Sequence, residues 1–309
     1  MTSSANKGAV LSAPLQGFTT RVWRAAHASV FGGVQVYYAP FMRVEHGAIR
    51  EKYITEVQRE GDVPNLVPQV LAGTPIEMRL MVTTLRDMGH RRIDINLGCP
   101  HPPVALKGRG SGLLARPLEL ENMLHALAAI DDVTYSVKMR LGWDDETQWR
   151  RVLPMLQLIN PVSVVVHPRI GRDQYKGVLR INQFESLLSE ATCPVVFNGD
   201  ITSQQQAHDI MARYPELAGV MVGRAMVSWP HRFTPKPLEL RQAYSDFHRL
   251  LLEGYAQRLQ GGPHQLLTCM KAQWALLLPD ADRRARKAIA KARDMGQYEQ
   301  AVTALLSSL

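Results

Sequence analysis

Short runs of apolar, β-branched and aromatic residues recur along the first three quarters of the chain, and amphipathic segments separate them. A short apolar run bounded by turn residues predicts a buried strand, whereas apolar residues at every third or fourth position predict a helix. The predicted strands are Val10–Ala13, Val34–Tyr38, Leu66–Val70, Ile93–Asn96, Tyr135–Arg140, Ser163–His167, Pro194–Asn198 and Val220–Gly223. The predicted helices are Arg21–Val30, Ile76–Met88, Pro117–Ile130, Glu146–Ile159, Asn182–Ser189 and Ser203–Arg213.

Strands that alternate with helices predict βαβ units and a parallel sheet. Eight such units in roughly 230 residues match the size of a (β/α)8 TIM barrel. A doubly wound sheet is the structural alternative. It is disfavoured because polar residues end nearly all of the predicted strands, as the shared mouth of a closed barrel requires. We therefore expect an α/β fold with a catalytic barrel over residues 1–235.

The pattern changes around Thr234–Pro237, and the remaining chain carries no strand signal. We expect a small all-helical domain over residues 236–309, in which Gly261-Gly262-Pro263 separates the first two helices. The predicted helices are Leu238–Gln260, His264–Leu278, Asp282–Arg293 and Gln297–Leu306. Because the third of these is strongly basic, it is either a solvated helix face or a docking surface for a polyanion.

Composition narrows the class of protein. The formal net charge of +8 and the pI near 9.5 favour a polyanionic partner such as nucleic acid. Cys99, Cys193 and Cys269 are widely spaced, so neither a disulfide framework nor a metal site is predicted. Residues 1–7 lack the apolar core of a signal peptide, and no run is apolar enough to span a bilayer. We expect a cytoplasmic protein without a metal or a membrane partner.

The most informative stretch is Ile93–Pro100, with the glycine-rich loop Lys107–Leu114 that follows it. The apolar alternation predicts a buried strand that ends at Asn96, with Cys99 just beyond it. In a parallel barrel these residues lie at the carboxyl-terminal mouth, where barrel enzymes carry their chemistry. The three glycines of the loop would allow it to approach a ligand closely.

Other predicted strands also end in polar side chains. Gln69 offers a donor and an acceptor at the end of the third strand. Lys138 and Arg140 are two positions apart in one strand, so they face the same side. Two buried cations need an anionic or polar ligand. His167 is followed by Arg169, and this pairing favours a ligand-binding histidine over a packed one.

The last two predicted strands suggest a phosphate site. Asn198, Gly199 and Asp200 follow the seventh strand, and Gly223 and Arg224 follow the eighth. The loops after these strands are the usual phosphate site of TIM barrels. The glycines permit close backbone approach, and the arginine can neutralise a phosphate.

These motifs, taken together, resemble those of the tRNA-dihydrouridine synthases. The resemblance covers the whole barrel in order, and the trailing helices resemble that family's tRNA-recognition domain in position and kind. It implies an FMN-bound barrel that uses NADPH to reduce the C5–C6 bond of particular uridines in tRNA. The matching segments are Ala13–Thr19, Gln69, Asn96–Pro100, Gly108–Leu114, Ser136–Asp144, Val166-His167, Asn198–Asp200 and Gly223-Arg224.

The resemblance also implies roles for individual residues. Cys99 would give a proton to uracil C5 after hydride transfer from FMN to C6. Asn96 and Arg140 would hold the uracil edge, and Tyr175 would lie near the substrate. The Leu-Gly-Trp-Asp run after Arg140 is most like the bacterial C-type branch, which acts in the D-loop. The implied cofactor contacts are Pro14, Leu15, Gln69, Lys138, His167, Asn198, Gly199, Asp200, Gly223 and Arg224.

The chain departs from the family pattern at several positions, of which His101-Pro102-Pro103 directly after the motif cysteine is the most prominent. Two alternatives therefore stay open at this point. One is a flavin-dependent barrel reductase of a free pyrimidine or another small molecule. The other is an inactive homologue that binds tRNA. We expect the protein to be a monomer under every one of these interpretations.

Overall fold

A computed structural model describes residues 8–59 and 62–309, and the segment 1–7 in which no signal peptide was expected lies outside them. Within the described ranges, nine parallel strands form one sheet in the order β5-β2-β1-β11-β10-β9-β8-β7-β6. Their bounds are β1 Ala9–Ser12, β2 Val36–Tyr38, β5 Leu66–Val67, β6 Gln69–Val70, β7 Arg92–Leu97, β8 Thr134–Gly142, β9 Ser163–Ile170, β10 Val195–Asn198 and β11 Gly219–Val222.

The sheet closes through the third predicted strand. Its first half, β5, pairs with β2, and its second half, β6, pairs with β7. Pro68 separates the halves because it has no amide hydrogen for the ladder, but its carbonyl still accepts the Asp94 N–H at 2.9 Å. β5 and β6 are therefore one interrupted barrel strand. The predicted (β/α)8 barrel is confirmed, and a doubly wound sheet is excluded.

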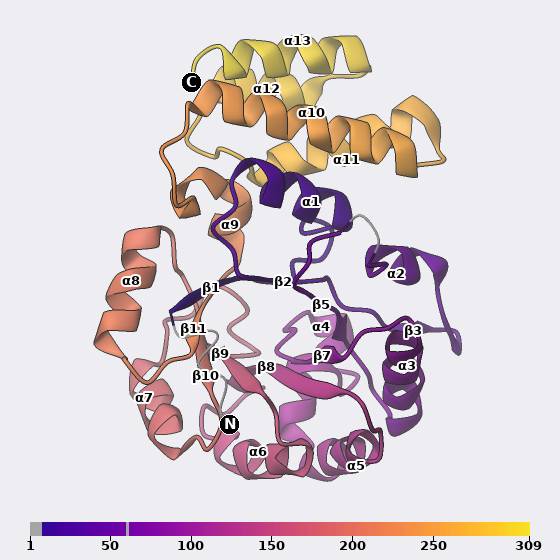
Figure 1. The fold of residues 1–309 in the computed structure, drawn as a ribbon, viewed down its shortest axis with the longest axis vertical. Coiled ribbons are helices and arrows are strands. Elements are labelled where there is room, and N and C mark those ends of the chain that lie inside the picture. The colour runs from indigo at the N-terminus through magenta and orange to yellow at the C-terminus, as the bar shows by residue number, and fades with distance from the viewer. Residues whose placement is uncertain (1–7, 60–61) are drawn as a thin grey trace.

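Helices surround the ring of strands, as Figure 1 shows. The predicted helix at Glu146–Ile159 is shorter than expected and changes type, because Pro154 cannot donate within it. The helices of the barrel are α1 Arg21–Val30, α2 Glu51–Glu56, α3 Pro75–Asp87, α4 Pro102–Ala105, α5 Pro117–Ala128, α6 Trp149–Met155, α7 Ile181–Glu190, α8 Gln204–Arg213 and α9 Arg224–Ser228, with 3-10 turns at Gly110–Ala115, Leu156–Ile159 and Pro230–Phe233. A short hairpin of β3 (Val44–Glu45) and β4 (Ala48–Ile49) precedes α2.

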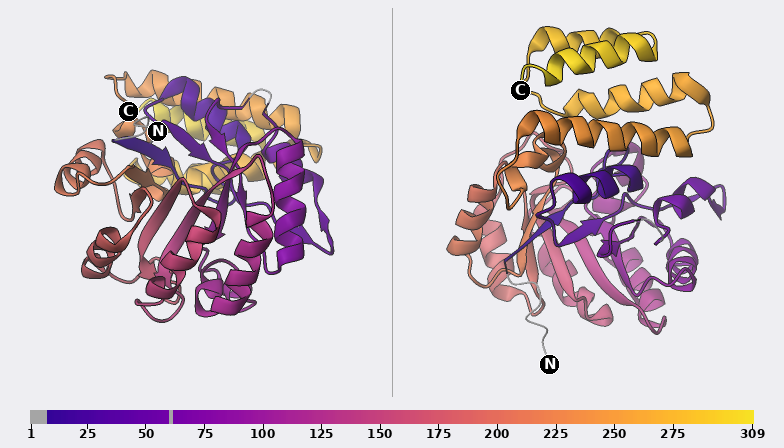
Figure 2. Two further views of the ribbon diagram at one scale, coloured as in Figure 1. Left: turned by 60° about the horizontal axis from the view of Figure 1, so that its bottom comes forward. Right: turned by 45° about the horizontal axis from the view of Figure 1, so that its top comes forward.

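The segments after residue 239 are helical, as predicted, and we call them the C-terminal helices. They lie to one side of the barrel against α1 (Figures 1 and 2). Phe247 packs edge-on against Trp23 of α1, with ring centroids 6.4 Å apart. No helix in the described part of the chain is both long and apolar enough to cross a membrane. Their bounds are α10 Leu240–Arg258, α11 Gly262–Leu276, α12 Arg283–Lys291 and α13 Met295–Leu306.

The inside of the barrel is apolar on one side and polar on the other. Alternate strand residues point inward, and those of β1, β2, β5, β9, β10 and β11 form a separate apolar cluster. In β7 and β8 the apolar side chains point outward and pack in the core between the strands and the helices. The side chains that point into the barrel are therefore the polar ones. These inward residues are Arg92, Asp94 and Asn96 of β7 and Ser136, Lys138 and Arg140 of β8.

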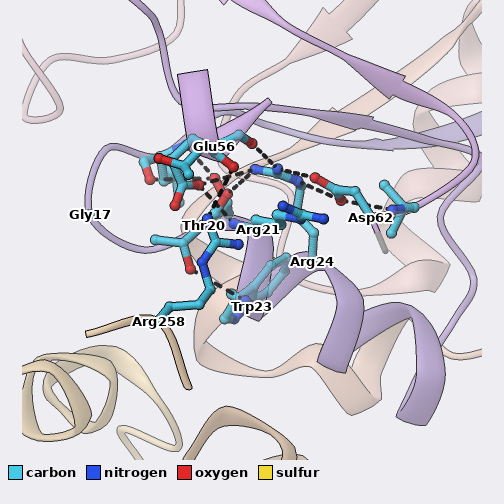
Figure 3. Close-up of polar contacts among 12 residues, drawn as sticks. Gly17, Thr20, Arg21, Trp23, Arg24, Glu56, Asp62 and Arg258 are labelled. Carbon is cyan, nitrogen blue, oxygen red and sulfur yellow. Dashed lines mark hydrogen bonds and ion pairs between the residues drawn. The ribbon is translucent and has the colours of Figure 1, made fainter. Parts of the chain in front are cut away.

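A buried ion pair fixes the start of α1. Arg24 lies inside the fold and donates to both carboxylate oxygens of Asp62, at 3.2 and 2.5 Å. It also donates to the backbone carbonyls of Thr19 and Glu56, at 2.9 and 2.6 Å. Figure 3 shows Arg24 reaching Asp62 beside Thr20 and Glu56. This arginine therefore joins the β1–α1 loop, α2 and the segment before β5.

Replacing Asp62 with alanine should lower the free energy of unfolding by about 3 kcal/mol, because the buried Arg24 cation then keeps only the more distant Glu56 carboxylate, 3.8 Å away. Urea denaturation would measure the change. Arg150→Ala is the matched control, since its pair with Glu190 is half exposed and should contribute at most about 1 kcal/mol. Equal losses in the two variants would contradict the prediction.

Candidate functional site

The residues predicted to share a site lie at the carboxyl-terminal ends of the parallel strands, so the barrel brings them to one mouth. Pro14 and Leu15 follow β1, next to the end of β11, because the Ala13 N–H donates to the Val222 carbonyl at 2.8 Å. The Leu15 N–H donates to Thr19 Oγ1 at 2.8 Å. This bond folds the β1–α1 loop back on itself beside the mouth.

A chain of hydrogen bonds connects the barrel interior to Cys99. Asn96 donates from Nδ2 to Gln69 Oε1 at 2.8 Å, and Gln69 donates from Nε2 to Asp94 Oδ2 at 2.6 Å. On its other side, Asn96 Oδ1 accepts the Cys99 backbone N–H at 2.8 Å. Because an ionised carboxylate only accepts, Asp94 determines which end of each amide faces the next residue. Gln69, Asn96 and Cys99 are thus brought together.

Asp94 is a member of this site that the sequence analysis missed. It is fully buried and also accepts the Ser136 hydroxyl at 2.6 Å. Burial raises its pKa to about 6, against the opposing effect of these hydrogen bonds. A signal was available, because Asp94 precedes Asn96 by two residues in the same strand and must face the same side.

The glycines of the loop after Cys99 serve packing within the protein. Ser111 donates to the Cys99 carbonyl from its backbone N–H at 3.1 Å and from its hydroxyl at 2.8 Å. Gly110 has a φ of +55°, and a Cβ there would lie 2.9 Å from Cys99 Cβ. A Cβ at Gly112 would lie 1.9 Å from the Ala105 carbonyl oxygen. Gly110 and Gly112 therefore let this loop pack closely against the Cys99 segment and α4, and its approach to a ligand stays a prediction.

The Cys99 thiol is set up to keep its proton. Burial raises the pKa of Cys99 above its usual value, and a hydrogen bond from the His101 backbone partly offsets the effect. The departure from the family pattern has a structural explanation here, because Pro102 and Pro103 form the first turn of α4. Proline is tolerated at these positions because their N–H groups have no partner within the helix.

Lys138 and Arg140 differ in how they are held. Lys138 lies beside Asn96 in the sheet register, and its ammonium makes no hydrogen bond or ion pair within the described residues. Burial, reinforced by the Arg140 cation, lowers the pKa of Lys138 to about 8. Arg140 donates from Nε to the Gly98 carbonyl at 3.1 Å and from Nη1 to the Ile170 carbonyl at 2.8 Å. The protein therefore satisfies Arg140, whereas no described residue pairs with the Lys138 ammonium and the Asp94 carboxylate acts on it only from a distance.

His167 is neutral, and Arg169 determines its tautomer. Arg169 Nη1 lies 3.0 Å from His167 Nε2, and because a guanidinium only donates, Nε2 accepts and Nδ1 carries the hydrogen. Burial, with help from neighbouring cations, holds the pKa of His167 well below its usual value. Arg169 also binds both carboxylate oxygens of Asp200, at 3.1 and 2.5 Å, and Arg224 donates to the same carboxylate at 3.0 Å.

Tyr175 lies across the mouth. Its ring is 48% exposed and is flanked by the guanidinium groups of Arg140 and Arg224, at 5.3 and 4.9 Å from the ring centroid. The His167 ring lies 6.3 Å away. These cation–π contacts connect the end of β8 with the start of α9 through one aromatic side chain.

The predicted phosphate residues lie together at the ends of β10 and β11. Asn198 donates from Nδ2 to a β11 carbonyl at 2.7 Å, which joins the two strand ends. Gly223 faces open space, because an added Cβ would meet only Ala13 Cβ, at 3.6 Å. Gly199 is tighter, since a Cβ there would lie 2.9 Å from the Leu179 side chain. The protein's own packing therefore does not require a glycine at position 223.

The buried carboxylate makes stability depend on pH. Because the folded-state pKa of Asp94 is raised to about 6 from 3.8, the folded protein binds more protons than the unfolded chain between these values. Relative to Asp94→Asn, which cannot titrate, the wild type should gain about 2 kcal/mol as the pH falls from 7 to 4. Urea denaturation of both proteins across this range would measure the difference. A difference that does not vary with pH would contradict the prediction.

Comparison with known proteins identifies the family. The family model for dihydrouridine synthase (Dus) matches residues 11–257. A probable tRNA-dihydrouridine synthase of Staphylococcus epidermidis is 31% identical over 183 residues, 58% of this chain and 56% of that protein, so the match spans little more than half of this relative. A probable tRNA-dihydrouridine synthase 2 of Bacillus subtilis is 28% identical over 74% of this chain and 71% of its own.

A tRNA-dihydrouridine synthase B of Pseudomonas syringae is 27% identical over 80% of this chain and 75% of its own. Among solved structures, a variant of NCR from Zymomonas mobilis has a TM-score of 0.50 at 12% identity, over 77% of this chain and 93% of its own, a likeness of fold alone. The matched residues run from β1 through most of α10 and include the whole strand-end site. The chain belongs to the dihydrouridine synthase family.

Proposed function

We propose that this protein reduces particular uridines of tRNA to 5,6-dihydrouridine, with FMN as its flavin and NADPH as the reductant. The observation that carries the proposal is the unpartnered ammonium of Lys138, held beside the Asn96–Cys99 segment at the barrel mouth. A half-buried cation without a counter-ion is costly unless a polar or anionic ligand meets it. Membership of the dihydrouridine synthase family supports a flavin as that ligand.

The residues at the mouth fit a flavin mononucleotide. Lys138 is free to meet the electron-rich edge of the ring, and the open space beside Gly223 leaves the strand backbone accessible to a phosphate. The Asp200 carboxylate is already bound by Arg169 and Arg224, so we assign its backbone to the cofactor. The residues that would hold FMN are Pro14, Leu15, Gln69, Lys138, His167, Asn198, Gly199, Asp200, Gly223 and Arg224.

When bound, the reduced flavin supplies a hydride to C6 of the uracil ring. Cys99 holds the proton that C5 then needs, because burial raises the pKa of its thiol and keeps it protonated at neutral pH. The hydrogen bond from the Cys99 N–H to Asn96 fixes the backbone that carries the thiol. Proton transfer from Sγ to C5 then completes the saturation of the C5–C6 bond.

Asn96, Arg140 and Tyr175 are placed to hold the uracil. Asn96 uses one Nδ2 hydrogen for Gln69, so its second Nδ2 hydrogen remains for a uracil carbonyl. Arg140 is fixed by two backbone carbonyls and supports the Tyr175 ring above the mouth. A uridine stacked in folded tRNA must leave its stack to reach these groups, at a cost of a few kcal/mol.

We assign residues 1–235 to the catalytic barrel and residues 236–309 to tRNA recognition. The exposed side of α12 and the two residues after it carry Arg283, Arg284, Lys287, Lys291 and Arg293, which form no ion pair within the described residues. Structured RNA is recognised largely through its shape and its backbone, for which such a row of cations is suited. A monomer suffices for this arrangement, since the barrel and the helices belong to one chain.

Cys99→Ser should retain the flavin and lose activity by roughly 10²-fold or more, because a serine hydroxyl is too weak an acid to protonate C5. The measurement is mass spectrometry of tRNA from cells that lack the protein and then receive either the wild type or the variant. With the wild type, one uridine should gain the mass of two hydrogens. Cys193→Ser, a partly buried cysteine before β10, is the matched control and should stay active. Wild-type turnover by Cys99→Ser would contradict the role of Cys99 as proton donor. Reduction of free uracil instead of tRNA by the wild type would favour a small-molecule reductase.

The double variant Arg284→Ala with Lys287→Ala should weaken tRNA binding. Each contact between a cation and a phosphate releases a counter-ion from the RNA, and the variant forms two fewer of these contacts. The slope of log affinity against log salt concentration should become shallower by about 1 for each cation removed. Filter binding over a range of salt concentrations would measure it. Arg79→Ala, an exposed cation on α3, is the control, and an equal slope change in this variant would argue against α12 as the docking surface.

A further inference from the structure

The β1–α1 loop, residues 13–20, carries Pro14 and Leu15 to the barrel mouth. Its turn is closed by the Phe18 and Thr19 N–H groups, which donate to the Leu15 carbonyl at 3.0 and 3.1 Å. At its outer bend, Gly17 has a φ of +82°, and nothing lies within 4 Å of where its Cβ would be. The bend therefore meets open space on this side, while Leu15 and Phe18 on either side of it pack against the core.

On the barrel side, the loop is held by α1. Arg24 donates to the Thr19 carbonyl at 2.9 Å, and the buried Asp62 keeps the guanidinium in place (Figure 3). Thr20 is the N-cap of α1 and accepts the Trp23 N–H at 3.3 Å. These contacts fix the end of the loop that is farthest from Pro14.

On the other side, the loop is held by the C-terminal helices. The Thr20 hydroxyl and the Tyr255 hydroxyl of α10 share a hydrogen bond of 2.7 Å. Gln273 of α11 donates to the Tyr255 hydroxyl at 3.1 Å, and the same amide lies 3.5 Å from the Gly17 carbonyl, at the limit of a hydrogen bond. Both side chains are buried, whereas their partners in the loop are partly exposed at Thr20 and exposed at Gly17.

We propose that Tyr255 and Gln273 are positioning residues for the flavin, which act through the β1–α1 loop. The inference rests on the proposed function, because Pro14 and Leu15 are assigned there to FMN. The C-terminal helices then have a second role beside recognition of tRNA: they hold one wall of the cofactor site. Since Gly17 lies at the bend and Thr20 at the end of the loop, contacts to both leave Leu15 little freedom to move away from the ring.

Tyr255→Phe tests the inference because it removes the shared hydroxyl and keeps the ring. FMN affinity, measured by quenching of flavin fluorescence, should weaken by about 5–10-fold, the loss expected for one buried hydrogen-bond centre. The visible absorption band of the bound flavin should also shift, since the loop borders the ring. Gln273→Leu should change both readouts in the same direction and to a smaller extent.

Tyr298→Phe is the matched control. Tyr298 is also a buried tyrosine of the C-terminal helices, and its hydroxyl accepts from Trp274 at 2.9 Å, but it does not contact the loop. It should lose thermal stability as Tyr255→Phe does and bind FMN within about 2-fold of wild type. Equal loss of FMN affinity in the two tyrosine variants, or wild-type affinity in Tyr255→Phe, would overturn the inference. Wild-type protein that binds no FMN would overturn the proposed function and this inference with it.

Discussion

The order of the site depends on a carboxylate buried inside the barrel. Asp94 can only accept hydrogen bonds when ionised, and its oxygens take them from Gln69 and Ser136. That fixes the direction of the Gln69 amide, which in turn fixes Asn96 and the backbone of Cys99. The position of the one thiol at the mouth is therefore set by a group two layers of side chains below it. Closure of the sheet at Pro68 makes this possible, because it brings β6 next to β7.

Around this chain the mouth gathers cations from separate strands. Arg140 is satisfied by carbonyls, and Arg169 and Arg224 share the Asp200 carboxylate. Lys138 remains, with its pKa lowered to about 8 by burial and by Arg140. Such an environment also keeps His167 neutral and available as a hydrogen-bonding group. The local field is therefore positive and suits a ligand that becomes more negative on reduction.

Much of this could be predicted from the sequence, because strand periodicity and strand-end polarity report directly on a parallel barrel. The elements that were missed are short, such as the β3–β4 hairpin and α2, which lack the length to show a period. The packing role of the glycine-rich loop could not be predicted, because glycine that packs on backbone and glycine that admits a ligand look alike in a sequence. Asp94 was overlooked, although its position two residues before Asn96 in the same strand already predicts that both side chains face the same side.

Contacts between residues far apart in the sequence could not be predicted from the periodicity of apolar residues. Thr20 and Tyr255 are 235 positions apart, and neither belongs to a motif. The change in pattern near residue 235 indicates where strands give way to helices, but it does not show what the helices touch. The structure places α10 and α11 against the loop that borders the proposed flavin site. A boundary in the sequence pattern therefore need not separate two independent parts: the helices that we propose bind tRNA also contact the loop that carries Leu15.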